Sequence, residues 1–382
     1  MMRASVLVLG AGFGGLELSS RLVSELGDAV DVTLIDRSDA FVFGFAKLDM
    51  TFGRRTPESI RVPYAAIGNG VRFRRETITA IDPVTRRVTT DAGTHEADIL
   101  VVALGADYDL AATPGLAEAG NEFYSIAGAT AVREILPTFR SGRAVIGICG
   151  TPYKCPPAPS EAAFLLDDHL RARGARDAVD ITVVSPFGIP VPPSPEMSSA
   201  ILARFAERGI EFLGGSKVDA LDPATHDAVL SDGSRLPYDL FLGIPVHRAP
   251  AVVLASALTE DGWIPVEKGS AATRFPGVYA VGDVTSVGTA KAGVFAERAA
   301  RAVADQLIAR IRGEQEPPGY DGTGACWMEF GEHEVARVDV DFFAVPGKPQ
   351  GTFTPPSDQT AGEKVEFAAS RRARWFGLEP ER

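Results

Sequence analysis

The sequence predicts an α/β fold with two Rossmann-like dinucleotide-binding domains and a C-terminal segment. Three observations predict it: a glycine-rich turn near the N-terminus, an internal repeat, and a late strand that ends in Gly-Asp. The 382 residues are enough for two or three domains. Hydrophobic residues make up 45% and charged residues 23% of the chain, which is the balance of a globular protein.

The glycine-rich turn has the full context of a dinucleotide-binding fingerprint. A strand-like apolar run over residues 6–9 precedes it, a helical pattern over 16–26 follows, and a second strand over 30–35 ends in an acid. Glycines let backbone N–H groups reach a pyrophosphate at a helix N-terminus, and the acid accepts a hydrogen bond from a ribose hydroxyl. The predicted cofactor-binding residues here are Gly10, Gly12, Phe13, Gly14, Gly15, Asp36 and Arg37.

The internal repeat predicts a second, similar domain that no longer binds a nicotinamide nucleotide. Ile81-Asp82-Pro83 recurs as Leu221-Asp222-Pro223, and each copy continues into an apolar strand and a glycine loop. The second copy begins with a strand over 143–148, but the loop after it, 149–159, is rich in proline rather than glycine. Prolines have no N–H to offer a pyrophosphate. Its next strand ends in Ser185, where an acid would be expected.

The late strand, residues 273–283, completes a resemblance to flavoproteins with two dinucleotide-binding domains, of the glutathione-reductase-like kind. The resemblance covers about residues 1–330 and implies FAD rather than NAD, with Ala103, Gly105, Gly282 and Asp283 as further cofactor-binding residues. It implies an FAD-binding domain from 1–108 and 246–312, a degenerate second domain from 109–245, and a segment over 313–382 that covers the flavin or forms an interface.

The segment from Pro152 to Glu161 is similar to the redox-cysteine segment of the flavocytochrome c sulfide dehydrogenase flavoprotein, and more distantly to that of sulfide:quinone oxidoreductase. Lys291-Ala292-Gly293 resembles the segment that opens the flavin-facing helix in both families, although Ala290 stands where proline is usual. The resemblance implies a redox pair of Cys155 and Cys326, with Glu161 as a base and Lys291 stabilising the reduced flavin. No cysteine precedes Cys149, so we expect FAD to be bound non-covalently.

The chemistry of the cysteines gives two further expectations. A helix N-terminus and the adjacent Lys154 would lower the pKa of the Cys155 thiol. Cys149 is expected to be buried, with a third redox sulfur as the alternative. The five histidines have no metal-ligand spacing, so no metal is expected.

The net charge and the hydropathy of the chain limit the classes of partner that it is expected to bind. A net charge of −12 argues against nucleic acid, and no apolar run reaches the length of a membrane span. The basic end from Arg371 to Phe376 would either touch an anionic membrane surface, with Trp375 and Phe376 inserted, or dock on a partner subunit. We expect a cytoplasmic protein, at most peripheral at the inner face of the membrane. A homodimer is one open alternative.

Together these features predict an FAD-dependent oxidoreductase that oxidises sulfide, a thiol or a persulfide through Cys155 and Cys326. A quinone or a small redox protein would accept the electrons. Two alternatives stay open. A type II NADH dehydrogenase-like quinone reductase would need a working phosphate loop at 147–152, and a non-catalytic flavin-binding redox sensor would turn over no acceptor.

Overall fold

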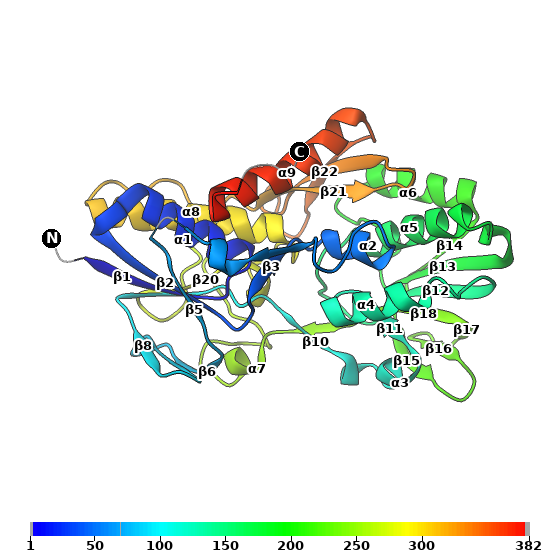
Figure 1. Ribbon diagram of the computed structural model, residues 1–382, viewed down its shortest axis with the longest axis horizontal. Coiled ribbons are helices and arrows are strands. Elements are labelled where there is room, and N and C mark those ends of the chain that lie inside the picture. The colour runs from blue at the N-terminus through cyan, green and yellow to red at the C-terminus, as the bar shows by residue number, and fades with distance from the viewer. Residues whose placement is uncertain (1–2, 69, 379–382) are drawn as a thin grey trace.

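A computed structural model describes residues 3–68 and 70–378 of the chain. Two five-stranded parallel sheets lie at opposite ends of its long axis (Figure 1). Their strand orders are β20-β9-β1-β2-β5 and β11-β18-β12-β13-β14. The predicted α/β class with two Rossmann-like domains is therefore confirmed.

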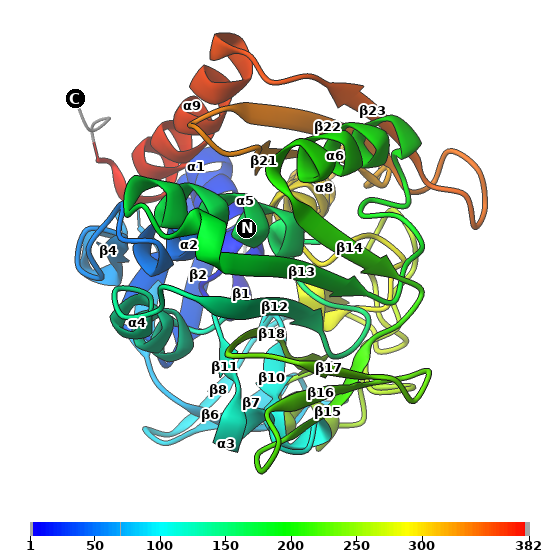
Figure 2. The same cartoon turned by 90° about the vertical axis from the view of Figure 1, so that its right-hand side faces the viewer.

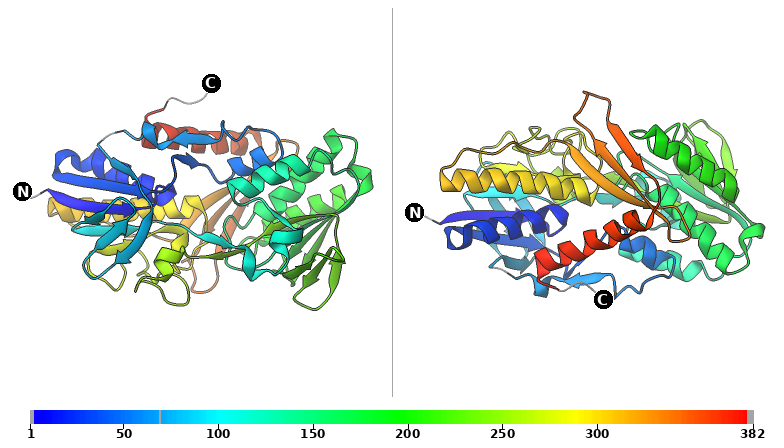
Figure 3. Two further views of the ribbon diagram at one scale, coloured as in Figure 1. Left: turned by 60° about the horizontal axis from the view of Figure 1, so that its bottom comes forward. Right: turned by 90° about the horizontal axis from the view of Figure 1, so that it is seen from above.

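The first sheet is built from both the beginning and the later part of the chain. Its strands are β1 (Ala4–Leu9), β2 (Val30–Asp36), β5 (Arg72–Arg75), β9 (Ile99–Val102) and β20 (Val278–Ala280). Helices α1 (Phe13–Leu26) and α8 (Gly293–Arg312) pack side by side on it (Figure 3). The smaller elements around it are β3 (Ala40–Val42), β4 (Arg61–Pro63) and α7 (Ala251–Leu254), whereas α2 (Ala46–Thr51) packs against the helix Ile126–Ile135 of the second domain.

The second sheet comes from the middle of the chain. Figure 2 shows its strands with α5 and α6 on one side. The strands are β11 (Asn121–Glu122), β12 (Gly142–Ile148), β13 (Val179–Ser185), β14 (Ile210–Gly214) and β18 (Leu240–Ile244), and the helices are α3 (Leu116–Ala119), α4 (Ile126–Ile135), α5 (Ala158–Ala172) and α6 (Pro195–Arg208). Where the chain enters and leaves this region, β10 (Asp107–Asp109) pairs antiparallel with β19 (Val246–Arg248).

The internal repeat is reproduced in fine detail. Each domain carries a three-stranded antiparallel meander, of β6 (Ile78–Asp82), β7 (Arg87–Thr90) and β8 (Thr94–Glu96) in the first and β15 (Val218–Asp222), β16 (Asp227–Leu230) and β17 (Arg235–Pro237) in the second. Both meanders have a register shift at equivalent positions. Both also have a non-glycine residue with positive φ, Arg86 and His226, in the first turn. This shared irregularity favours duplication over chance similarity.

The C-terminal segment forms an antiparallel sheet of β21 (Thr323–Glu329), β22 (Val335–Asp341) and β23 (Gln350–Thr354), followed by α9 (Asp358–Phe376). In Figures 1 and 3, α9 runs back toward the first domain, where its C-terminal end meets the start of α1.

The two aromatic residues of the basic end do not lie as membrane insertion would require. Trp375 is 1% exposed, Phe376 is also buried, and the indole N–H of Trp375 donates to Glu17 Oε2 at 2.8 Å. Arg374 pairs with the same carboxylate at 2.7 Å. These aromatic side chains are already packed against the chain's own first domain, so they are not available to insert into a membrane or to dock on a partner subunit.

Candidate active site

One cavity of about 410 Å³ joins the dinucleotide fingerprint to both predicted redox cysteines. It is lined by the loops that follow β1, β9, β12 and β20, together with β21 and α9. Ligands of open parallel sheets bind at the carboxyl ends of the strands, so this is the expected place for a site. The predicted residues on its wall are Gly10, Gly12, Phe13, Gly14, Asp36, Ala103, Gly105, Cys155, Glu161, Gly282, Asp283, Lys291 and Cys326.

The fingerprint turn cannot accept side chains at two of its glycines. Gly10 has φ +98°, and a Cβ there would lie 2.4 Å from the carbonyl oxygen of Ala103. A Cβ on Gly15 would lie 1.8 Å from the carbonyl oxygen of Gly10. Gly15 therefore keeps α1 close to β1 and does not itself line the cavity. Helix α1 starts at Phe13 with no side-chain cap, which leaves its first N–H groups for a ligand.

Asp36, the last residue of β2, and Arg37, which follows it, point in different directions. Asp36 faces the cavity and accepts hydrogen bonds from the backbone N–H groups of Ala11 and Ser38, both at 2.8 Å. Each carboxylate oxygen keeps a lone pair for a ribose hydroxyl. Arg37 points away: its side chain is 71% exposed, with its guanidinium 3.7 Å from Asp107. It is not among the residues that line the cavity.

Asp283 and Lys291 lie where β20 and α8 meet the cavity. The Asp283 carboxylate accepts no hydrogen bond from the residues that the structure describes, and burial raises its pKa. Lys291 donates to the backbone carbonyls of Asp283 (2.6 Å) and Thr285 (3.1 Å), and its ammonium lies 3.4 Å from the centre of the Trp263 ring. Burial lowers the pKa of Lys291 to about 8. A free carboxylate acceptor next to a held ammonium fits the hydroxyl-rich chain of a flavin dinucleotide.

Cys155 and Cys326 are brought to the same cavity wall from two distant segments. Cys155 precedes α5, has φ +53°, and its N–H donates to the carbonyl of Lys291 at 2.8 Å. Cys326 lies on β21, whose neighbouring strand holds it opposite Val338. Both are free thiols in the structure. Each is partly exposed, and a Cys326 thiolate is one of the charges that raise the pKa of Cys155.

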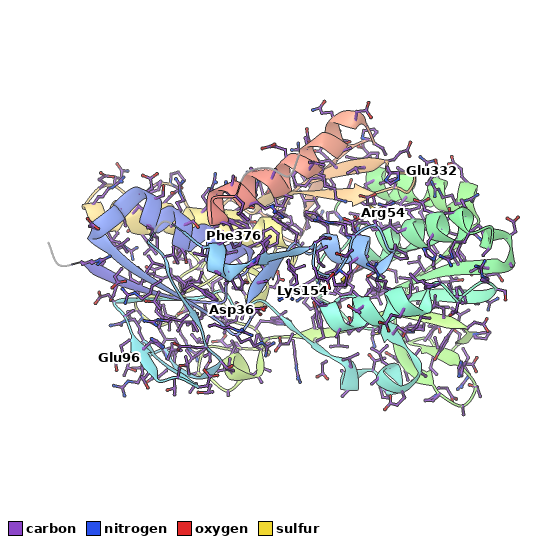
Figure 4. All side chains as sticks on the ribbon, viewed as in Figure 1. Asp36, Arg54, Glu96, Lys154, Glu332 and Phe376 are labelled. Atoms are coloured by element: carbon purple, nitrogen blue, oxygen red, sulfur yellow. The ribbon has the colours of Figure 1, made fainter. Side chains whose placement is uncertain are left out.

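The expected lowering of the pKa of Cys155 is wrong. Burial, followed by the nearby Glu161 carboxylate, raises it. Lys154 does not offset these effects because its ammonium turns away, donating to the carbonyl of Ala106 at 2.7 Å and lying 4.4 Å from the centre of the Tyr108 ring. Figure 4 shows Lys154 between the two domains. Cys155 therefore needs a base in order to become a thiolate.

Glu161 is placed to be that base. It lies in the first turn of α5, its Oε2 is 3.9 Å from the sulfur of Cys155, and its Oε1 accepts the N–H of Glu329 at 3.1 Å. Burial raises the pKa of Glu161 to about 7. A carboxyl group that titrates near neutral pH can both accept and return a proton.

Several residues of this region were not predicted from the sequence. Lys364, on α9, donates to Glu329 Oε1 at 2.6 Å and lines the cavity. Burial would lower its pKa, but Glu161 and Glu329 outweigh burial and raise it. His247 was also not predicted as a site residue. Its Nε2 accepts the N–H of Lys154 at 3.3 Å, and burial lowers its pKa to about 3. Neither residue lies in a motif, so only tertiary structure could show their roles.

Cys149 is separated from the other two cysteines. It is buried in the apolar cluster between the second sheet and its meander, and burial raises its pKa to about 12. This position supports the structural interpretation rather than a third redox sulfur.

The second domain has no counterpart of the fingerprint turn. Helix α5 begins at Ala158, nine positions after Cys149, with Pro157 as its N-cap and Pro159 in its first turn. Ser185, at the end of β13, is buried, and its hydroxyl accepts the N–H of Phe187. The loop 149–157 instead crosses to the first domain, where the backbone of Lys154 forms an isolated parallel β-bridge with that of Lys291.

Comparison with known proteins fixes the class. The family model of pyridine nucleotide-disulphide oxidoreductases matches residues 4–304, and the chain belongs to this family. Mouse mitochondrial sulfide:quinone oxidoreductase is 25% identical over 358 residues, covering 89% of this chain and 79% of the mouse protein. The resemblance to the sulfide:quinone oxidoreductase group is therefore confirmed.

Two further matches differ in extent. The X-ray structure of sulfide:quinone oxidoreductase from the hyperthermophilic bacterium Aquifex aeolicus has a TM-score of 0.85 at 24% identity, covering 97% of this chain and 91% of that one. A type II NADH:quinone oxidoreductase of Staphylococcus epidermidis is 38% identical, but only over 106 residues, or 27% of this chain and 26% of that protein.

No helix over 3–68 and 70–378 is long and apolar enough to cross a membrane. Within the same residues, no group of histidine, cysteine and acidic side chains is arranged to hold a metal ion.

Proposed function

We propose that the chain is an FAD-dependent oxidoreductase that oxidises sulfide or a related sulfur nucleophile, such as a thiol or persulfide, through Cys155 and Cys326. One observation carries the proposal: a single cavity connects a dinucleotide fingerprint, two thiols and a carboxyl group that titrates near neutral pH. The similarity to sulfide:quinone oxidoreductases over most of the chain supports the same activity.

The chain's own residues fit FAD. Gly10 and the uncapped start of α1 suit the pyrophosphate, Asp36 suits the ribose, and the free Asp283 carboxylate suits the ribityl hydroxyls. When bound, FAD would supply a two-electron acceptor. Lys291 would hold a positive charge at that acceptor. With Cys149 buried behind the second sheet, no described cysteine before Cys155 faces the cavity, so we propose non-covalent binding.

Cys155 and Cys326 would react as a disulfide in the oxidised enzyme. The sulfur of the nucleophile forms a new S–S bond with one cysteine while the Cys155–Cys326 bond breaks, and its electron pair stays on the other cysteine as a thiolate. Glu161 takes the proton that the incoming sulfur loses. Across the cycle the sulfur is oxidised by two electrons, which leave through the flavin to a quinone or a small redox protein.

A second hollow supports access for that acceptor. A groove of about 770 Å³ lies between α8, α9 and β21. Trp327 and Phe367, whose ring centres are 5.0 Å apart, line both this groove and the cavity. An acceptor in the groove would be separated from the cavity by two aromatic rings.

Anaerobic stopped-flow absorbance tests the proposal. The holoenzyme is mixed with sulfide, a thiol, NADH or NADPH in parallel, and bleaching of the flavin band at about 450 nm is followed. We expect fast bleaching by a sulfur donor and slow bleaching by the nucleotides. Fast bleaching by NADH would instead support a type II NADH dehydrogenase, and no bleaching by any donor would support a redox sensor.

A further inference from the structure

Helix α5 holds the end of β21 through two carboxylates on one of its faces. Glu161 Oε1 accepts the backbone N–H of Glu329, the last residue of β21, at 3.1 Å. Asp168 Oδ2 accepts the backbone N–H of Glu332, in the turn after β21, at 2.7 Å. Glu161 and Asp168 are seven positions apart, so they lie two helical turns apart on the same face of α5. The C-terminal sheet is therefore attached to the second domain at two points.

The turn that Asp168 holds has an unfavourable backbone conformation. Its two central residues, Glu332 and His333, have φ +52° and +65°. The N–H of Glu334 donates to the carbonyl of Gly331 at 2.9 Å across the turn. Two successive positive φ values favour glycine or asparagine, and neither residue type stands at these positions. A contact from outside the turn is needed to stabilise it, and the hydrogen bond to Asp168 supplies one.

Two arginines hold the Asp168 carboxylate in one orientation. Arg208 is buried, and its Nη1 lies 2.7 Å from Oδ1 of Asp168. A Cβ on Gly331 would lie 2.6 Å from the same Nη1, so the turn packs directly on this guanidinium. Arg54 Nη2 lies 3.6 Å from Oδ2 of Asp168, and its Nη1 donates to Glu329 Oε2 at 3.0 Å. Arg54 thus links Asp168 on α5 to the last residue of β21.

Both cysteines of the proposed pair lie next to these contacts. Cys155 is three positions before the first residue of α5, and its carbonyl accepts the N–H of Ala158 at 2.9 Å. Cys326 lies on β21, three positions before Glu329. Three residues of an extended strand span about 10 Å, so a tilt of the strand end moves Cys326 as well. The spacing of the two sulfurs therefore depends on how firmly α5 holds β21.

We propose that Asp168 is a positioning residue for the redox pair: by holding the turn after β21 against α5, it sets the distance between the sulfurs of Cys155 and Cys326. This inference rests on the proposed function. The contact at Glu161 alone would leave a single point about which β21 could tilt, and the contact at Asp168 removes this freedom. Asp168 does not line the cavity, so it acts without touching substrate or cofactor.

Bridging of the two thiols tests the inference without turnover. The reduced holoenzyme is treated with dibromobimane, which joins two thiols that lie close together, and peptide mass spectrometry gives the ratio of bridged to singly labelled protein. We expect Asp168→Ala to lower this ratio about tenfold, because a hydrogen bond to a charged group is lost. Asp168→Asn keeps an oxygen that can accept the N–H of Glu332, and it should restore part of the ratio.

Asp222→Ala is the matched control. Asp222 also accepts a backbone N–H within a turn, from Ala224 at 3.0 Å, and it also pairs with an arginine, Arg235. It lies in the meander of the second domain and does not line the cavity. Its replacement should leave the ratio unchanged.

Three results would overturn the inference. They are an equal ratio in the wild type and in folded Asp168→Ala, a ratio in Asp168→Asn as low as that in Asp168→Ala, and no bridge in the wild type. If Asp168→Ala does not fold, Arg54→Met replaces it. This variant keeps Asp168 but removes the link to Glu329, so it should also lower the ratio, and an unchanged ratio there would count against the inference.

Failure of the proposed function gives a different result. If the ratio falls in Asp168→Ala but sulfide does not bleach the flavin of the wild type, the positioning role stands and the proposed function fails. If sulfide bleaches the wild type while the ratio is unchanged in Asp168→Ala, the function stands and the positioning role fails.

Discussion

At the scale of single residues, the site combines a thiol that is hard to ionise with a carboxyl group that titrates near neutral pH. Burial raises the pKa of Cys155 and that of Glu161, and the two groups lie 3.9 Å apart. Neither residue is reactive by itself. The thiol still holds its proton more tightly than Glu161 does, so proton transfer from Cys155 to this carboxylate is uphill.

Replacing either cysteine of the pair tests the disulfide mechanism. We expect Cys155→Ser and Cys326→Ser each to slow flavin reduction by sulfide at least about a hundredfold, with the double variant little worse, because the two sulfurs act as one unit. Stopped-flow absorbance measures the rates. Cys149→Ala is the control and should keep most of the activity, since Cys149 lies outside the cavity. Full activity of Cys326→Ser would exclude the mechanism.

The pH dependence tests Glu161. Its pKa of about 7 means that the basic form is present above neutral pH and is lost as the pH falls. Flavin reduction should therefore rise with pH through about 7, and Glu161→Gln should remove this limb. Lys364→Met should shift the limb to higher pH by about one unit, because the ammonium of Lys364 favours the carboxylate. A limb that stays in place in both variants would show that another group titrates.

At the scale of secondary-structure elements, α9 packs against the glycine-rich turn of the fingerprint and holds it in place. Phe13, within the glycine-rich turn, packs on Trp375 edge-on with 5.6 Å between ring centres and is stacked on Phe367 at 6.1 Å. Arg374 and Arg371 pair with Glu297 on α8. Helix α9 is thus held by aromatic rings and by ion pairs at once.

Removing the aromatic contact between α9 and the fingerprint turn should weaken cofactor binding. Trp375→Ala removes a fully buried side chain, which costs about 3–5 kcal/mol in the free energy of unfolding. We expect a lower Tm and less FAD per chain after gel filtration. Val365→Ala, on the same helix and 70% exposed, is the control and should change neither quantity. Unchanged FAD content in Trp375→Ala would show that α9 does not support the site.

Elements near the motifs were predictable, and those held by distant contacts were not. The apolar spacing and glycines of the first 36 residues define β1, α1 and β2 because the physical causes are local. The burial of Trp375 was missed because a run of arginines before Trp-Phe has the same pattern on a surface helix. Its partners, Glu17 and Glu297, lie far away in sequence.

At the scale of the whole molecule, the two similar domains contribute different parts of the site. The first copy keeps the glycine turn and the acid, while the loop of the second copy carries Cys155 into the first copy's cavity. The sequence predicted this division because prolines and glycines are visible in it. It could not predict the pKa of Cys155, which depends on burial and on the direction of Lys154.

The division predicts that nicotinamide nucleotides are poor donors. Pro156, Pro157 and Pro159 have no N–H to offer a pyrophosphate, and Ser185 is committed to Phe187. Micromolar NADH should bleach the flavin far more slowly than sulfide, and NADH should not raise the Tm. Tight binding of NADH, measured by calorimetry, would contradict this assignment.

The hydrogen bond from Trp375 to Glu17 also affects the order in which the chain folds during synthesis. The two residues belong to the first and last helices described, so a ribosome delivers one of them well before the other. Contacts of such long range form slowly during folding. The nascent first domain must therefore wait, with its aromatic cluster uncovered, until α9 has emerged. Until then, the uncovered cluster is the part of the first domain most exposed to aggregation.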